Sequence, residues 1–417
     1  MSDIETTKPS DGAHVPALDG VRGLAILMVL LLHFWPESFA LGHLGPAGVA
    51  ATKLAMGGLW GVELFFVLSG FLITGILLRS RQGPGYFRNF YMRRVLRIFP
   101  LYYGTLVILL VLLPAFVALD RPAQAIRQHS FWLWTYLSNF PLTSGEIPSG
   151  WDDSRLFWVG HFWSLCVEEH FYMVWPLVVW SVGPNRLARV CVVVVAFSAS
   201  VRLLNALASV SWGPDVALLH WTTLTKLDGL AVGSLIAVGF NSGATRARAL
   251  AVSRRVFLPS ALIFLAIVLI PRRWDSGFLL VPGETAIVAF FGCVLIRLLV
   301  ADERSWWRTC FQWGWLRMLG RYSYGLYVLH GVLRPTLMRW IDVDSIHASV
   351  RFAPLSLALY LGAVLGLCLG IAVLSYHGYE APFLRLKRFF PSGGRSGVRI
   401  ESTTAERTEP AVASRDP

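Results

Sequence analysis

Apolar residues fill ten stretches of the chain, separated by shorter segments rich in arginine, glycine and proline. Each stretch is close to the length that a helix needs to cross the hydrocarbon core of a bilayer. The pattern predicts an all-α polytopic membrane protein, a single bundle of about ten transmembrane helices. The predicted spans lie near residues 20–36, 57–78, 98–118, 161–182, 187–207, 217–239, 254–271, 277–300, 322–340 and 353–375.

The region between residues 119 and 160 does not fit this pattern. Its apolar stretch, Phe131–Phe140, is too short to cross a bilayer comfortably and is rich in aromatic residues. Aromatic side chains concentrate at membrane–water interfaces. We therefore expect an interfacial or re-entrant segment here, and a sugar-binding cleft on the outer side could be lined by Trp132, Trp134, Trp151 and Trp158.

Composition supports a membrane protein and argues against a soluble one. Hydrophobic residues make up 55% of the 417 residues and charged residues 15%, and the mean hydropathy is +0.56, outside the usual range of soluble domains. The five cysteines have no CxxC spacing and lie mostly in apolar stretches. We therefore expect no disulfide framework and no metal site.

The net charge of +12 does not indicate a nucleic-acid partner, because the arginines gather in short segments between the apolar stretches. Under the ten-span count these segments share one side of the membrane, and the positive-inside rule then places both termini in the cytoplasm. Residues 1–19 lack a cleavable signal pattern and are predicted to be a cytoplasmic segment before the membrane domain, residues 20–390. Residues 391–417 have the composition of a disordered cytoplasmic tail.

Two ionisable residues lie inside the first predicted span. Arg22 and His33 are eleven residues apart, which is about three helical turns, so a helix places both on one face about 16 Å apart along its axis. An arginine near the centre of a membrane helix costs about 2.5–3.5 kcal/mol, and such residues usually have a function. The pair therefore predicts a site that runs from the water boundary at Arg22 into the bilayer at His33.

Carboxylates from two other spans are predicted at a similar depth in the outer half of the membrane. Glu63 lies near the outer end of the second span and Glu168 lies in the fourth. A carboxylate that orients and charges an imidazole is a common way to make a general base. We expect Glu168 or Glu63 to orient His33, which makes these three the candidate catalytic residues.

The fourth span carries several polar residues at helical spacing. His161, Ser164, Glu168 and Tyr172 fall on one face of a helix. With His330 of the ninth span, the residues His161, Ser164 and Tyr172 are the candidate substrate-binding groups.

A second group of candidates lies on the cytoplasmic side. Arg93 and Arg97 are one turn apart just before Pro100, and Arg22 begins the first span on the same side. Guanidinium pairs suit phosphate well. An anionic donor could bind its phosphates at these arginines while a flexible arm extends along the Arg22–His33 face to the imidazole. Acyl-coenzyme A has this form.

These residues resemble the membrane-bound acyltransferase family 3, which O-acylates bacterial surface polysaccharides, lipopolysaccharide O-antigens, peptidoglycan and some secondary metabolites. The Arg22–His33 spacing is similar to the family hallmark and implies that His33 is the catalytic base. The resemblance covers residues 15–390 and also rests on Leu64–Ile73, on the RxxR-type motif Arg93–Pro100, on the SLxxExxFY-like Ser164–Tyr172, and on Asp228–Gly233, Ser323–His330 and Glu380–Phe383.

Departures from the family pattern are mild. Glu63 stands where aspartate is typical and Lys226 where arginine is frequent, and Cys166 and His170 replace serine and glutamine. Some family members carry a C-terminal extracytoplasmic hydrolase-like domain. Here only a short tail follows the last span, so the membrane unit would act alone or with a separate extracytoplasmic transferase partner.

The predicted function is that of a multi-pass O-acyltransferase of the bacterial inner membrane, surrounded by membrane lipids. It would transfer an acyl group, most simply acetyl, from cytoplasmic acyl-CoA to a hydroxyl of a cell-surface or lipid-linked glycan, either directly or through an acyl-enzyme. A macrolide-type metabolite is the alternative acceptor. A proton-coupled transporter or glycan flippase is the alternative from another class, and a structural or sensory membrane protein is a third.

Overall fold

The fold is built from helices alone throughout the residues that the structure describes. The computed structural model describes residues 15–141, 154–212, 221–242, 246–269, 277–302 and 305–391. This confirms the predicted all-α class. Most of the predicted N-terminal segment, most of the predicted tail, and Trp151 lie outside the described residues.

Eight stretches of the described residues are helical, long and apolar enough to cross a membrane. They confirm a polytopic membrane protein, whereas the count of about ten is not confirmed. The eight are α1 (Pro16–Phe34); α3 (Gly45–Met56) with η1 (Gly57–Trp60) and α4 (Gly61–Ser80); α5 (Tyr86–Val107) with η2 (Ile108–Leu112) and α6 (Leu113–Phe116); α12 (Pro184–Trp212); α13 (Thr223–Asn241); α14 (Arg246–Leu269); α15 (Gly277–Val300); and α20 (Ala353–Ser375) with η5 (Tyr376–Glu380), α21 (Ala381–Arg385) and η6 (Leu386–Phe389).

Two predicted spans form long helices that are not among these eight. Helix α11 (Trp163–Val182) has 20 residues and α18 (Ser323–Trp340) has 18. Polar residues lower their hydropathy: Glu168, Glu169 and His170 in α11, and His330 and Arg334 in α18. These two helices carry most of the candidate substrate-binding residues.

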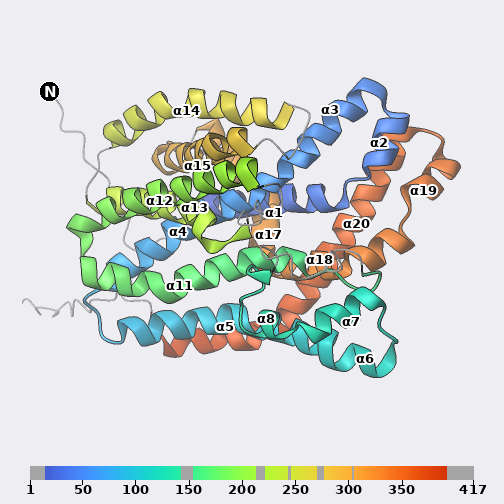
Figure 1. Cartoon of the computed structure of the whole chain (residues 1–417), viewed down its shortest axis with the longest axis horizontal. Coiled ribbons are helices and arrows are strands. Elements are labelled where there is room, and N and C mark those ends of the chain that lie inside the picture. The colour runs from blue at the N-terminus through green and yellow to red at the C-terminus, as the bar shows by residue number, and fades with distance from the viewer. Residues whose placement is uncertain are drawn as a thin grey trace, which may run out of the picture.

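Short helices join the long ones. In Figure 1, α2, α7 and α19 lie near the same end of the bundle, the end at which α1 finishes. The apolar stretch that begins at Phe131 forms a single short helix, α8, followed by turns, in keeping with the prediction that it does not cross the membrane. The short helices are α2 (Glu37–His43), α7 (Arg121–Gln128), α8 (Phe131–Trp134), η3 (Gly160–Phe162), α16 (Trp306–Phe311), α17 (Gly314–Arg321) and α19 (Val343–Val350).

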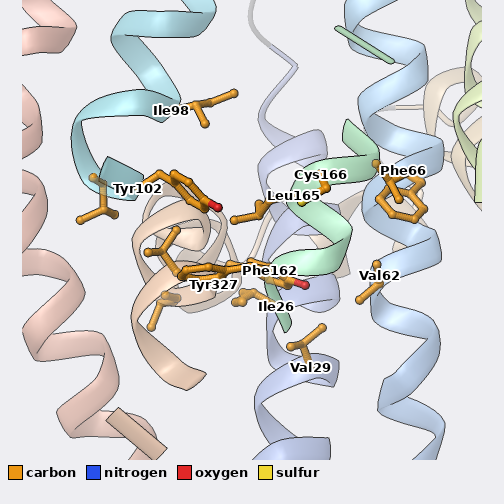
Figure 2. Packing of buried hydrophobic residues seen from close by; sticks show 14 of the residues in the cluster. Ile26, Val29, Val62, Phe66, Ile98, Tyr102, Phe162, Leu165, Cys166 and Tyr327 are labelled. Atoms are coloured by element: carbon orange, nitrogen blue, oxygen red, sulfur yellow. The ribbon is translucent and has the colours of Figure 1, made fainter. Parts of the chain in front are cut away.

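Helix α1 lies against the main hydrophobic core. Buried Ile26 and Val29 of α1 belong to the same cluster as Phe66 of α4, Tyr102 of α5 and Tyr327 of α18 (Figure 2). In contrast, only 17% of the α14 span is buried within the protein. The helix that carries Arg22 and His33 is therefore held firmly by its neighbours, while α14 presents most of its surface to lipid.

Candidate active site

His33 lies in the last turn of α1, in contact with a second histidine. Its Nδ1 is 2.9 Å from the carbonyl oxygen of Val29 and 3.3 Å from Nε2 of His330 in α18. The ring of His161, in η3, lies 4.6 Å from that of His330. His33, His330 and His161 form the histidine cluster. His330 and His161 are buried, at 0% and 2% exposure, whereas His33 is only half-buried.

Backbone carbonyls fix the hydrogen positions in the two contacting rings. Nδ1 of His330 is 2.7 Å from the carbonyl oxygen of Tyr327, and Nδ1 of His33 faces that of Val29. Because a carbonyl only accepts hydrogen bonds, Nδ1 must carry the hydrogen in both rings. In their neutral forms both rings then have their lone pair on Nε2. Nε2 of His330 accepts from Nδ1–H of His33, and Nε2 of His33 is left as a base.

Trp158 and Arg334 complete the surroundings of His33. The Trp158 ring lies 4.8 Å from the His33 ring, and the Arg334 guanidinium lies 5.7 Å from the Trp158 ring centre. Nε of Arg334 donates to the carbonyl oxygen of His33 at 2.8 Å. Gly331 leaves space for His161, because a Cβ there would lie 2.2 Å from Cε1 of His161. The imidazole of His33 is thus held by its neighbours while it stays accessible.

The predicted polar face of α11 connects the histidine cluster with the opposite end of the bundle. The Ser164 hydroxyl forms a short hydrogen bond with that of Tyr327, whose ring is 5.5 Å from the His330 ring. Further along the helix, Tyr172 is hydrogen-bonded to Ser69 of α4 at 2.5 Å. Both of these hydroxyls lie near the Glu168 carboxylate. Polar side chains therefore follow α11 from His161 to Tyr172.

Arginines gather at the far end of this face. The charges of Arg94 and Arg97 act on Arg22, which also pairs with Asp19 at 2.9 Å. The Arg94 guanidinium lies 5.3 Å from the Tyr172 ring centre and acts on Glu168. We call Arg22, Arg94 and Arg97 the arginine cluster. In the structure, Arg94 therefore lies near two of the arginines predicted to bind the donor, Arg22 and Arg97.

Arg93 is hydrogen-bonded to the C-terminal segment. Its Nη1 donates to the backbone carbonyls of Phe390, at 2.9 Å, and Lys387, at 3.3 Å. This contact fastens the end of the last span to α5. The residue predicted to bind phosphate beside Arg97 therefore has backbone acceptors as its partners, and its neighbour in the sequence, Arg94, faces the interior.

Glu63 lies in a separate group of charges between α4, α12, α13 and α15. Its carboxylate accepts from Lys226 at 3.1 Å, and Lys226 also donates to Glu284 at 3.0 Å. Arg202 pairs with Asp228 at 2.6 Å and lies 3.7 Å from Glu284. We call these five residues the ion network; each is at most 5% exposed. Among the described contacts, the hydrogen bonds of His33 go to Val29, His330 and Arg334 rather than to Glu63 or Glu168.

Comparison with known proteins identifies the family. A family model described as an acyltransferase domain matches residues 15–377 of the chain. The chain belongs to this acyltransferase family. The match confirms the family predicted from the sequence motifs.

Curated relatives of this acyltransferase share about a quarter of its residues. It is 26% identical to peptidoglycan O-acetyltransferase OatA of Listeria monocytogenes over 334 residues, which are 76% of this chain and 49% of the relative. It is 28% identical to the protein named "Putative peptidoglycan O-acetyltransferase YrhL" of Bacillus subtilis over 384 residues, which are 88% and 55% of the two chains. The chain thus spans about half the length of these relatives. No solved structure matches it.

Three residues beside the candidate site are not among the catalytic, donor-binding or substrate-binding residues predicted from the sequence. Arg94 carries a signal that could have found it, because Arg94 and Arg97 have the i, i+3 spacing of the RxxR-type motif. The sequence predicts Trp158 only as part of a sugar-binding cleft, and Trp134, predicted to line the same cleft, stacks on Tyr103. Arg334 lies one turn after His330, which places it beside the histidines.

Proposed function

We propose that the chain transfers an acetyl group from cytoplasmic acetyl-CoA to a hydroxyl of a cell-surface or lipid-linked glycan. Family membership supports acyl transfer, and the names of the relatives support an O-acetyl product and a glycan acceptor. The observation that carries the proposal is the His33 imidazole, whose Nδ1 faces the Val29 carbonyl and His330 and whose Nε2 is left as a base.

The arginine cluster supports an anionic donor. Arg22, Arg94 and Arg97 bring three guanidinium groups to one end of the polar α11 face, and guanidinium binds phosphate by charge-assisted, bidentate hydrogen bonds. Arg22 and His33 lie on the same helix, about 16 Å apart along its axis. The phosphates of acetyl-CoA would bind at the arginines, and its extended arm would follow this face and bring the thioester toward His33.

The histidine cluster would then act in three steps. Nε2 of His33 takes the proton of the acceptor hydroxyl as the hydroxyl oxygen attacks the thioester carbon. Nδ1–H of the resulting imidazolium donates to Nε2 of His330, which stabilises the added charge. The C–S bond breaks, and the sulfur leaves with the proton that His33 took up, so that the ester and the free thiol of coenzyme A are formed and His33 is neutral again.

The test compares His33→Ala with the wild type in liposomes. The probes are acetyl-CoA labelled in the acetyl group and peptidoglycan fragments, with thiol release and labelled fragment as readouts. General-base catalysis typically contributes 10²–10⁴-fold, so we expect transfer to fall by about that factor while acetyl-CoA binding is retained. The control is His129→Ala, which removes a histidine with the same bond to a carbonyl four residues earlier and should leave transfer unchanged.

Three outcomes would contradict this proposal. Equal transfer by well-folded His33→Ala would remove His33 as the base. A folded wild type that neither binds nor consumes acetyl-CoA would remove the donor. Movement of a glycan across the bilayer without consumption of thioester would favour the transporter instead.

A further inference from the structure

A basic pocket lies apart from the site already described, between α14, the end of α15 and α16. It has a volume of about 260 Å³. One water takes about 30 Å³ of liquid volume, so the pocket has room for several waters or for a phosphate-bearing group. Its polar lining comes from Arg254, Arg297, Asp302 and Ser305, and Trp307 forms part of its apolar lining.

Arg297 is held in place as a binding group. Its Nε donates to the Ser253 hydroxyl at 3.0 Å, and its guanidinium lies 3.9 Å from the centre of the Phe257 ring. These contacts occupy one edge and one face of the guanidinium and leave the Nη donors for a ligand. Exposed Arg254 adds a second cation to the same wall. With two guanidinium groups and one carboxylate, that of Asp302, the lining favours an anion.

The pocket is continuous with a surface that faces lipid. The α14 span is only 17% buried within the protein. Leu258 and Leu262 lie about one and two turns after Arg254, on its side of the helix, and both are exposed. A ligand at this position can therefore place an anionic group against the two arginines and apolar chains along α14.

We propose that this pocket binds the headgroup of an anionic phospholipid, with the acyl chains packed along α14. Basic pockets between membrane helices are a known form of lipid-headgroup site. A free phosphate shares the charge of such a headgroup but has no use for the apolar surface of α14. The proposal does not depend on the reaction proposed above.

The bound lipid would also stabilise the start of α1. Helix α16, which supplies Trp307 to the pocket, packs so closely on α1 that a Cβ at Gly20 would lie 1.8 Å from the carbonyl oxygen of Phe311. Gly20 is two residues before Arg22. A lipid that joins α14, α15 and α16 would thus support the helix that carries Arg22.

The test uses the full chain in nanodiscs made of phosphatidylcholine alone or with added phosphatidylglycerol. A ligand that binds only the folded state raises the unfolding temperature, so we expect phosphatidylglycerol to raise it for the wild type. The double variant Arg254→Gln/Arg297→Gln should lose this gain and should bind phosphatidylglycerol at least about tenfold more weakly, which corresponds to about 1.4 kcal/mol. Native mass spectrometry measures the retained lipid.

Matched variants separate this site from general charge effects. Arg186→Gln/Arg189→Gln removes two exposed arginines from the start of α12 and should keep the gain. Asp302→Asn removes the carboxylate of the wall and should strengthen phosphatidylglycerol binding, a gain that poor folding cannot imitate.

The proposal is overturned if phosphatidylglycerol gives the wild type no gain, or if the Arg254/Arg297 double variant keeps it. It is also overturned if inorganic phosphate, added to phosphatidylcholine nanodiscs, gives the same gain through the same arginines, because the ligand is then a free phosphate.

Discussion

The histidine cluster and the ion network both place ionisable side chains within the membrane bundle, and they satisfy them in opposite ways. In the ion network each of the five charged residues is at most 5% exposed and has a partner of opposite sign at 2.6–3.7 Å. In the histidine cluster the rings contact one another and backbone carbonyls, and His33 is half-buried. Charge is balanced internally in the first region and is largely avoided in the second.

This difference distinguishes charged side chains that stabilise the fold from a side chain that is available for catalysis. The pairs of the ion network join four helices, and each of its cations donates a hydrogen bond to a carboxylate of the network. His33 shares its Nδ1–H with its neighbours and leaves Nε2 for another molecule. Burial of an ionisable residue in a membrane helix is therefore a weak sign of catalysis by itself. An unused lone pair on a partly exposed ring is a stronger one.

The largest expected effect follows from breaking the ion network at Lys226. Its ammonium is shared by Glu63 and Glu284, so Lys226→Met leaves two buried carboxylates without their common cation. Removing one partner of a buried ion pair typically costs about 3–5 kcal/mol. We expect a matching loss of stability, measured as the free energy of unfolding in detergent.

A companion variant tests whether charge balance is the cause. Lys226→Met/Glu63→Gln removes a cation and a carboxylate together and should recover part of the lost stability, in a double-mutant cycle with Glu63→Gln. Should Lys226→Met unfold like the wild type, the network would not be structural, and Glu63 would return as a candidate partner in catalysis.

The contrast between these two regions also shows which features of the site can be predicted from the sequence. The length of the first apolar stretch and the eleven-residue spacing predicted that Arg22 and His33 share one helix, and α1 contains both. This prediction succeeds because the relative position of two residues on one helix is set by helix geometry alone. The partner of Glu63 was not predicted, because Lys226 and Glu284 come from distant helices whose rotation about their own axes is fixed only by packing.

The same limit explains why the predicted number of spans is not confirmed and why the contacts of Arg93 and Arg94 were not predicted from the sequence. Helices α11 and α18 are long enough to cross a membrane, yet their polar residues lower the mean hydropathy by which a membrane span is recognised. Spacing alone favoured Arg93 with Arg97, one turn apart. The position of the C-terminal segment beside α5 decides that Arg93 meets backbone carbonyls and Arg94 the interior.

A smaller effect is expected from His330→Phe, which keeps a buried ring and removes the acceptor for Nδ1–H of His33. A hydrogen bond to a charged group contributes about 1.5–3 kcal/mol, so we expect kcat to fall about 10–100-fold with an unchanged KM for acetyl-CoA. His161→Phe is the comparison, because it alters a ring that touches His330, and it should reduce kcat less. A rise in KM at constant kcat for His330→Phe would mean that His330 binds substrate and does not support His33.

The smallest effect is expected from two neighbouring arginines of α5, of which we expect one to stabilise the fold and the other to bind the donor. Arg93→Gln and Arg94→Gln remove the same charge from adjacent positions of α5, so each is the control for the other. Arg94 faces Glu168 and Tyr172, and loss of its guanidinium should raise the KM for acetyl-CoA by about tenfold, which corresponds to about 1.4 kcal/mol. Arg93 bonds the carbonyls of Phe390 and Lys387, so its loss should lower the unfolding temperature and leave KM nearly unchanged. If both variants raised KM equally, the arginines would act as a diffuse positive field, and the side on which each guanidinium lies would not matter.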